Sequence, residues 1–284
     1  MRRVIAFLAV LFVFVWSTAY GQSVAPWEQV WIPAKESTFG GGTKDINLDA
    51  ALSKPVGNGP FPLFIWNHGS TGRGIISVKS SERYTALVKV LVNQGFAVIV
   101  PMRRGRGASG GYYGESEHTM CDYSQNASGL ERAMEDIDAV IAYAKTQPFI
   151  DSSRITIGGI SRGGFLSVMY GAFRPGVPVT KVFNFVGGWT NDVCFNFNGP
   201  MFERAGGARK VPALWVYGER DLNYSDDSIR GYAESFKRGG GEMIFRLYPH
   251  DLKDGHSIML RHNLWLNEFL QFLVGFDPNN PFGK

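Results

Sequence analysis

From residue 60 onward, short runs rich in Val, Ile and Phe alternate with segments that carry a helical pattern of apolar residues. The runs have the length and composition of buried strands. They lie at residues 62–67, 95–101, 154–159, 181–188, 212–218 and 243–249. Helical patterns occupy residues 81–95, 130–147, 225–240 and 257–275. Such alternation is typical of a mostly parallel sheet with helices on both faces, so we predict an α/β fold with about eight strands.

The amino-terminal stretch MRRVIAFLAVLFVFVWSTAYGQ places Arg2 and Arg3 ahead of an apolar run that ends in small residues. This order is typical of a secretory signal peptide. The apolar run has about 13 residues and would span about 20 Å as a helix, less than the roughly 30 Å core of a bilayer, which disfavours a permanent membrane anchor. We expect a signal peptide at 1–21 and a secreted or periplasmic domain at 22–284.

The remaining chain contains no second long apolar run, repeat or low-complexity linker, which fits one large domain. The formal net charge of the whole chain is only +4, which gives no reason to expect a nucleic-acid partner. Cys121 and Cys194 are the two cysteines. An exported protein meets an oxidising compartment, so we favour a disulfide between them over two separate thiols.

The pattern Gly-x-Ser-x-Gly occurs twice, around Ser109 and around Ser161. Ser161 lies between the strand at 154–159 and GGFLSVMYGAF, which reads as the beginning of a helix. A nucleophilic serine at a sharp strand-to-helix turn needs this context, with small residues on either side. Ser109 is followed by a polar, glycine-rich stretch without a helical period. We predict that Ser161 is a nucleophile, the alternative being a turn that only packs closely or binds an anion.

A serine nucleophile requires a histidine base and a carboxylate that orients the histidine, in the chain order serine, acid, histidine for this fold. Asp221 follows the strand at 212–218 and is the predicted acid. Glu219 is the competitor. Asp226 and Asp227 read better as caps at the beginning of the next helix.

Two histidines follow the strand at 243–249, His250 and His256. His256 stands between Gly255 and the beginning of a helix, where the loop turns back toward the sheet. We therefore predict that His256 is the base and that His250 is an ordinary polar loop residue.

The strand at 62–67 runs into HGSTGRG, a glycine-rich turn whose backbone can approach a substrate carbonyl closely. The N–H of Ser70 and the N–H of Arg162, the residue after the predicted nucleophile, are the predicted oxyanion donors. His68 is expected to brace the turn, the alternative being a base in its own right.

Two connections, at 102–127 and 189–210, are longer than a sheet needs, and long connections are often functional. Arg104 in the first is a candidate for binding a substrate carboxylate, against a solvated charge or a structural salt bridge. Trp189 in the second is a candidate wall of a substrate pocket, against a residue packed beneath a loop.

Taken together, HGS after one strand, GGISRGG after another, an acid after the next-to-last strand and GH before the final helix resemble the α/β-hydrolase superfamily over about residues 55–276. The chain is most similar to its dienelactone hydrolase and prolyl-oligopeptidase-like branch. RRGRGASGG resembles the RGxGxSGG loop of that branch, in which the serine is not the nucleophile. Dienelactone hydrolases proper carry cysteine where this chain has Ser161.

The resemblance implies a serine hydrolase that works through an acyl-enzyme without a metal or organic cofactor, and the predicted signal peptide implies that it is exported. A carboxylic ester hydrolase that takes a small-molecule ester is the simplest expectation. A peptidase or amidase uses the same catalytic residues and is the alternative, and a non-catalytic binding protein with this fold is a third hypothesis.

Overall fold

The computed structural model of the chain describes residues 27–38, 41–70, 84–115 and 121–275. The signal peptide predicted at 1–21 lies outside them. Along the chain the elements are β1 (Glu28–Ser37), β2 (Thr43–Ser53), β3 (Phe61–Asn67), α1 (Thr85–Asn93), β4 (Ala97–Pro101), α2 (Tyr123–Lys145), β5 (Ile150–Ile160), α3 (Arg162–Phe173), β6 (Val179–Phe185), η2 (Asp192–Cys194), α4 (Asn198–Ala208), β7 (Ala213–Gly218), α5 (Asp226–Arg238), β8 (Met243–Tyr248), η3 (Gly255–Leu260) and α6 (His262–Val274).

The described strands form one eight-stranded sheet in the order β1-β2-β4-β3-β5-β6-β7-β8. All pairs from β4 to β8 are parallel, whereas β1 pairs with β2 and β2 with β4 in antiparallel fashion. The predicted mostly parallel α/β fold is confirmed. Because β3, β5, β6, β7 and β8 run in the same direction, the loops after their carboxyl ends all gather at one edge of the sheet.

The antiparallel ribbon of β1 and β2 was not among the strands predicted from the sequence. Its alternating burial, with Ile32 and Ala34 inside and Trp31 half exposed, is that of an edge strand with one face in water. Pro33 interrupts the apolar pattern there, and proline is tolerated only at such an edge. The alternation of buried and exposed residues in β1 therefore carried a weaker strand signal than the continuous apolar runs further on.

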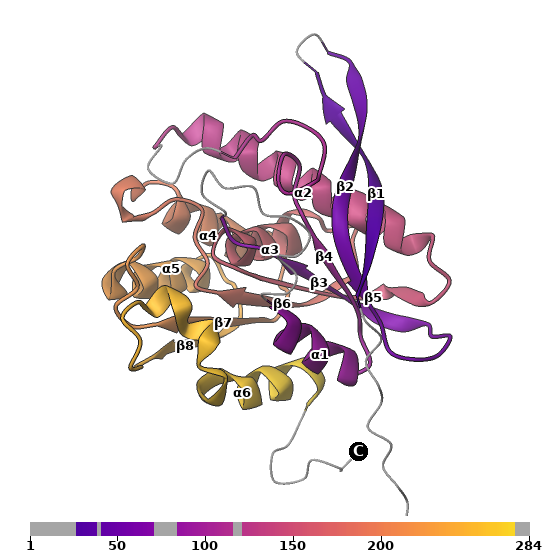
Figure 1. Ribbon diagram of the computed structural model, residues 1–284. Coiled ribbons are helices and arrows are strands. Elements are labelled where there is room, and N and C mark those ends of the chain that lie inside the picture. The colour runs from indigo at the N-terminus through magenta and orange to yellow at the C-terminus, as the bar shows by residue number, and fades with distance from the viewer. Residues whose placement is uncertain (1–26, 39–40, 71–83, 116–120, 276–284) are drawn as a thin grey trace, which may run out of the picture.

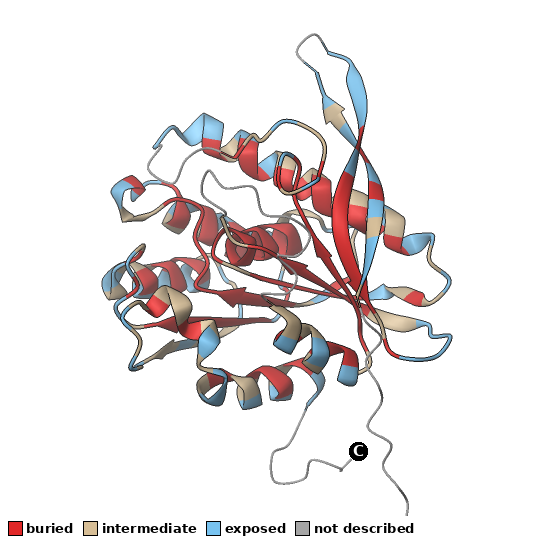
Figure 2. Ribbon diagram, viewed as in Figure 1, coloured by how far each residue is buried: buried red, intermediate tan, exposed pale blue. Residues whose placement is uncertain are grey.

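Helices cover both faces of the sheet, α1 and α6 on one side and α2, α3, α4 and α5 on the other (Figure 1). The strands at the centre are buried along their length, and the outer turns of the helices carry most of the exposed residues (Figure 2). Phe269 of α6 packs 4.2 Å from Phe183 of β6, centroid to centroid. On the opposite face, Phe202 of α4 lies 4.5 Å from Trp215 of β7.

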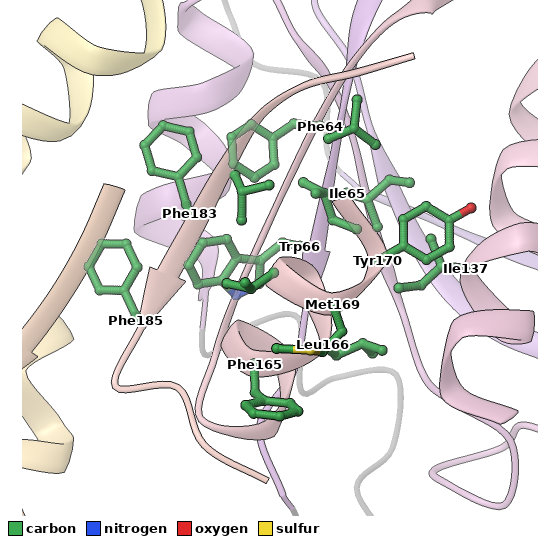
Figure 3. Packing of buried hydrophobic residues seen from close by; sticks show 14 of the residues in the cluster. Phe64, Ile65, Trp66, Ile137, Phe165, Leu166, Met169, Tyr170, Phe183 and Phe185 are labelled. Carbon is green, nitrogen blue, oxygen red and sulfur yellow. The ribbon is translucent and has the colours of Figure 1, made fainter. Parts of the chain in front are cut away.

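Neighbouring residues of β3 show how one strand serves both layers. Phe64 and Trp66 point toward the α1 and α6 side, and Ile65 points the other way, toward Ile137 of α2 and Tyr170 of α3 (Figure 3). All three β3 residues are fully buried. A strand buried on both faces reads as a continuous apolar run, which is why this strand could be predicted.

The connection at 189–210 is not a plain loop, because it contains η2 and the helix α4. The connection at 102–127 also ends earlier than expected, since α2 begins at Tyr123 and is capped by Asp122, whose side chain accepts from Gln125 N. The sequence Asn198–Ala208 contains three glycines and a proline, so its helical propensity is low. Burial of Met201, Phe202 and Ala205 against the sheet stabilises the helix in spite of this low propensity.

Candidate active site

Ser161 occupies the turn between β5 and α3, as the sequence predicted. Its backbone has φ 56° and ψ −126°, one of three non-glycine residues with positive φ in the described part of the chain. Such a conformation costs on the order of 1–3 kcal/mol and persists only where the surroundings enforce it. Here Ser161 N donates to Phe185 O of the neighbouring strand at 2.8 Å. The serine is thus held in the strained strand-to-helix turn that a nucleophile elbow requires.

Glycines make this elbow possible. A Cβ at Gly163 would lie 2.2 Å from Asn67 O, and a Cβ at Gly159 would lie 2.5 Å from the same oxygen. Real Cβ atoms do not approach backbone oxygen this closely, so neither position admits a larger residue. The turn after β3 therefore packs directly on the elbow.

Asp221 and His256 lie in contact, each in the loop that the sequence predicted. His256 Nδ1 is 2.7 Å from Asp221 Oδ2. The other carboxylate oxygen accepts from Asn223 N at 2.7 Å and from Tyr224 N at 3.3 Å, which fixes the carboxylate plane. The Nδ1 atom of His256 therefore carries the proton donated to Asp221, and Nε2 is left as the basic nitrogen.

The competing residues have other roles. His250 Nε2 lies 2.6 Å from Glu219 O, and Leu252 N donates to His250 Nδ1 at 3.0 Å. Both ring nitrogens of His250 are therefore hydrogen-bonded to backbone atoms. Asp226 accepts from Arg220 N. The cap of α5 is Ser225, whose side chain accepts from Ser228 N, so the prediction that Asp226 and Asp227 cap this helix is wrong by one residue.

The turn after β3 adjoins Ser161 from the other side. A Cβ on Gly69 would lie 3.1 Å from Ser161 Cβ and 3.2 Å from Ile160 O. Ser70 is the next residue along the chain. Arg162 is the first residue of α3, so its N–H has no carbonyl four residues back within the helix. The structure thus brings the two predicted oxyanion donors to the neighbourhood of the serine.

The side chain of Arg162 is fully buried and structural. Its Nε donates to Trp189 O at 2.8 Å, and its guanidinium carbon lies 5.0 Å from the centre of the Trp189 ring. Trp189 is itself fully buried and packs 6.1 Å from Phe165. The structure therefore corrects the prediction that Trp189 lines an open substrate pocket, because this side chain belongs to the core beneath the loop.

Arg104 also differs from the prediction. Its Nε donates to Asp136 Oδ1 at 2.8 Å, and its backbone N donates to Asp136 Oδ2 at 2.8 Å. A second carboxylate, Glu135, lies 3.1 Å from Arg104 Nη2. This buried arginine is thus engaged by α2, and the structural salt bridge replaces the predicted contact with substrate.

A buried ionic cluster centred on Glu115 was missed by sequence reasoning. Arg103 bonds Glu115 through Nε, Arg162 Nη1 lies 3.4 Å from Oε2, and Arg106 Nη2 lies 3.9 Å from the same oxygen. Burial alone would raise the pKa of Glu115, but the arginines, Arg103 foremost, hold it well below its usual range. Three guanidinium groups surround this one carboxylate, so the cluster carries surplus positive charge, and one of its members, Arg162, is the residue after Ser161. The glycine-rich loop offered no sequence signal for Glu115.

His68 lies within the same cluster and is 2% exposed. Burial, with the nearby charge of Arg103, lowers its pKa from 6.5 to about 3. A neutral imidazole is therefore present at neutral pH. This supports the predicted bracing role of His68 and disfavours a role as base.

Ser109, the other serine in a Gly-x-Ser-x-Gly pattern, is a structural residue. Its Oγ donates to Met102 O at 2.7 Å and accepts from Asp49 N at 2.8 Å. The hydroxyl therefore ties the loop after β4 to β2.

Cys121 and Cys194 form a disulfide, in agreement with the favoured prediction. The bond joins the segment before α2 to η2, 73 residues further along the chain. Within the described ranges, no three His, Cys, Asp or Glu side chains are grouped so as to hold a metal ion. No helix in those ranges is long and apolar enough to cross a bilayer.

Comparison with known proteins agrees with this geometry. The chain belongs to the dienelactone hydrolase family, whose model matches residues 75–261. The fold is shared with an esterase of Pyrococcus furiosus (TM-score 0.60, 16% identity, 87% of this chain and 90% of that one). It is also shared with Est1E of Butyrivibrio proteoclasticus bound to ferulic acid (TM-score 0.57, 20% identity, 81% and 96%). At these identities the likeness shows the fold alone.

A relative in sequence is the quorum-quenching protein AidA of Acinetobacter baumannii. It is 29% identical over 122 residues, which is 43% of this chain and 34% of that protein. The match thus spans about a third of that relative. The family predicted from the motifs around Ser161 and the turn after β3 is confirmed, with hydrolase chemistry as the family's activity.

Proposed function

We propose that this protein is an exported serine hydrolase that cleaves carboxylic esters through an acyl-enzyme. The observation that carries the proposal is the occurrence of a strained Ser161 elbow together with an Asp221–His256 hydrogen bond of 2.7 Å, in the chain order that this fold uses. The export part rests on the charged, apolar and small-residue order of the first residues. A disulfide, which persists in oxidising compartments, supports it.

In the proposed reaction, Ser161 Oγ attacks the ester carbonyl carbon while His256 Nε2 takes the serine proton. Asp221 holds the imidazole by Nδ1 and stabilises the imidazolium that forms. The N–H groups of Ser70 and Arg162 donate to the oxyanion.

The tetrahedral intermediate collapses as the alcohol leaves with the proton returned by His256. Water then attacks the acyl-enzyme, His256 takes a proton from that water, and the carboxylic acid is released as Ser161 regains its hydrogen. Apart from the ester and this water, the groups named in these steps belong to the chain.

The test compares Ser161→Ala with Ser109→Ala, the serine in the second copy of the same pattern. With p-nitrophenyl butyrate as substrate, Ser161→Ala should lose activity by about 10⁴-fold or more. Ser109→Ala should keep kcat within about twofold, because Ser109 bonds only backbone of β2 and the loop after β4. Undiminished turnover by Ser161→Ala would contradict the proposal.

A panel of substrates determines which acyl group and which leaving group the enzyme prefers. Esters of graded acyl length, a phenolic acid ester and a lactone should be turned over faster than the matching aminoacyl arylamides. Faster cleavage of the arylamides would move the assignment from esterase to peptidase while leaving the role of Ser161 intact.

A further inference from the structure

We propose that Arg103 and His68 are positioning residues that aim the N–H of Ser70 at the oxyanion. This inference rests on the proposed function and adds two residues to it that touch neither substrate nor nucleophile. It is carried by the hydrogen bonds on the two carbonyl groups of the turn after β3.

Arg103 holds both of those carbonyl groups. Its Nη1 donates to His68 O at 2.7 Å, and its Nη2 donates to Gly69 O at 3.4 Å. The guanidinium is itself held in place by Glu115, which accepts from Nε and, at 3.3 Å, from Nη2. Because Arg103 is 1% exposed and both His68 and Glu115 are buried, the guanidinium group cannot turn away into water.

His68 adds a second bond to the carbonyl of Gly69. Arg103 N donates to His68 Nε2 at 3.2 Å, so Nε2 is the acceptor and the ring proton is on Nδ1. That Nδ1 lies 2.6 Å from Gly69 O, to which it donates. The backbone N–H of Arg103 thus fixes the tautomer of His68, and the side chain of Arg103 donates to Gly69 O, the same carbonyl oxygen to which His68 donates.

The orientation of Ser70 follows from the geometry of the peptide bond. In a trans peptide the C=O and the following N–H point in opposite directions. Because Gly69 O is drawn toward Arg103 and His68, the N–H of Ser70 must point in the opposite direction, away from these two side chains. Gly69 adjoins Ser161, with only 3.1 Å between its missing Cβ and Ser161 Cβ, so a donor turned this way can reach an oxyanion formed on the serine.

Without these bonds the peptide between Gly69 and Ser70 is free to rotate, since glycine permits most backbone conformations. A rotated peptide would present a carbonyl oxygen, which repels an oxyanion, where a donor is needed. The expected defect is therefore in the transition state, with little change in substrate binding.

The test measures a p-nitrophenyl ester and the matching thionoester with Arg103→Lys and His68→Phe. Sulfur accepts hydrogen bonds weakly, so a thionoester gains little from an oxyanion donor. Both variants should lose about 10- to 100-fold in kcat for the oxoester, with KM changed by less than about threefold. Their loss for the thionoester should be several-fold smaller, so the oxoester to thionoester ratio falls.

His68→Asn provides the rescue, because its amide N–H can take the place of Nδ1–H, and it should recover most of the ratio lost in His68→Phe. Arg104→Lys is the matched control: the neighbouring arginine is equally buried but bonds Asp136, so the ratio should stay at the wild-type value. Thermal unfolding establishes that each variant is folded, and if Arg103→Lys does not fold, the His68→Phe and His68→Asn pair decides.

An unchanged ratio in folded His68→Phe, or an equal fall in Arg104→Lys, would overturn the inference. Either result leaves the proposed function standing, provided that Ser161→Ala is inactive and Ser109→Ala is active. Activity that survives in Ser161→Ala would instead remove the reaction on which the inference depends.

Discussion

His256 Nδ1 and Asp221 Oδ2 lie 2.7 Å apart, although the two residues are 35 positions apart in the chain. Each follows a strand of the parallel sheet, Asp221 after β7 and His256 after β8, and these strands are neighbours. Adjacent parallel strands deliver their following loops to the same edge, so the pair is a direct product of sheet order. The imidazole is thereby fixed in the tautomer that a serine needs.

Asp221→Asn should lower kcat for an ester by about 10³- to 10⁴-fold, because an amide can donate to the imidazole and favour the wrong tautomer. The fold should be retained, since asparagine keeps the shape of the side chain. Asp226→Asn is the control. Asp226 lies in the first turn of α5 and accepts from Arg220 N, so this substitution should leave kcat within about twofold of the wild-type value. Steady-state kinetics of both variants decides, and equal losses in the two would count against the assignment of Asp221.

Gly163→Ala should destabilise the fold by about 3 kcal/mol or more and abolish activity, because the new Cβ would lie 2.2 Å from Asn67 O and 2.5 Å from His68 O. Gly231→Ala is the matched substitution. Gly231 lies inside α5 with nothing within 4 Å of its Cβ position, so alanine should stabilise the protein by about 0.5–1 kcal/mol. Urea unfolding of both variants gives the two free energies, and a well-tolerated Gly163→Ala would refute the close approach of the turn after β3 to the elbow.

Acid should destabilise the protein partly through His68. Burial lowers the pKa of His68 from 6.5 to about 3, so between these values the unfolded chain binds a proton that the folded chain does not. The contribution is constant above about pH 6.5, and stability falls below it by up to about 1.4 kcal/mol per pH unit. His68→Phe lacks this titration, so its free energy of unfolding should change less between about pH 6.5 and about pH 5. Parallel slopes for wild type and variant would rule out a buried neutral His68.

Reduction of the disulfide should lower stability. The bond closes a loop with a sequence separation of 73, for which the chain-entropy argument gives about 4 kcal/mol as an upper value. Thermal unfolding of the wild type with and without reductant, beside the Cys121→Ser/Cys194→Ser double variant, measures it. The reduced wild type and the double variant should unfold at similar temperatures, both below the oxidised protein. A double variant as stable as the oxidised protein would show that the bond contributes nothing.

Much of this fold could be predicted because its central strands are buried on both faces. A strand such as β3 must be continuously apolar, and that signal stands out without any knowledge of its neighbours. The edge strand β1 has one face in water and contains a proline, and the first residues of β2 are mostly exposed, so the pattern of this ribbon was not recognised. Helix α4 was missed for a related reason, since its glycines hide a helix that is held by packing on Trp215.

The candidate site divides in the same way. The motif around Ser161 and the loops after β7 and β8 could be recognised from the residues next to them in the chain. The structure brings Asp221 to His256 as predicted. The partners of buried side chains outside these motifs could not be predicted. Arg103 and Arg104 are adjacent in sequence, yet one holds the turn after β3 and the other holds α2. The two arginines differ in the partners that their side chains reach in the folded chain, and neighbouring positions in the sequence do not reveal that difference.

The central claim is that Ser161 is the nucleophile, and covalent labelling tests it most directly. Intact-protein mass spectrometry after treatment with a fluorophosphonate should show one adduct per chain, and peptide mapping should place it on Ser161. Ser109→Ala should label at the wild-type rate, and Ser161→Ala should not label. An adduct that persists in Ser161→Ala, or that maps to another residue, would contradict the account.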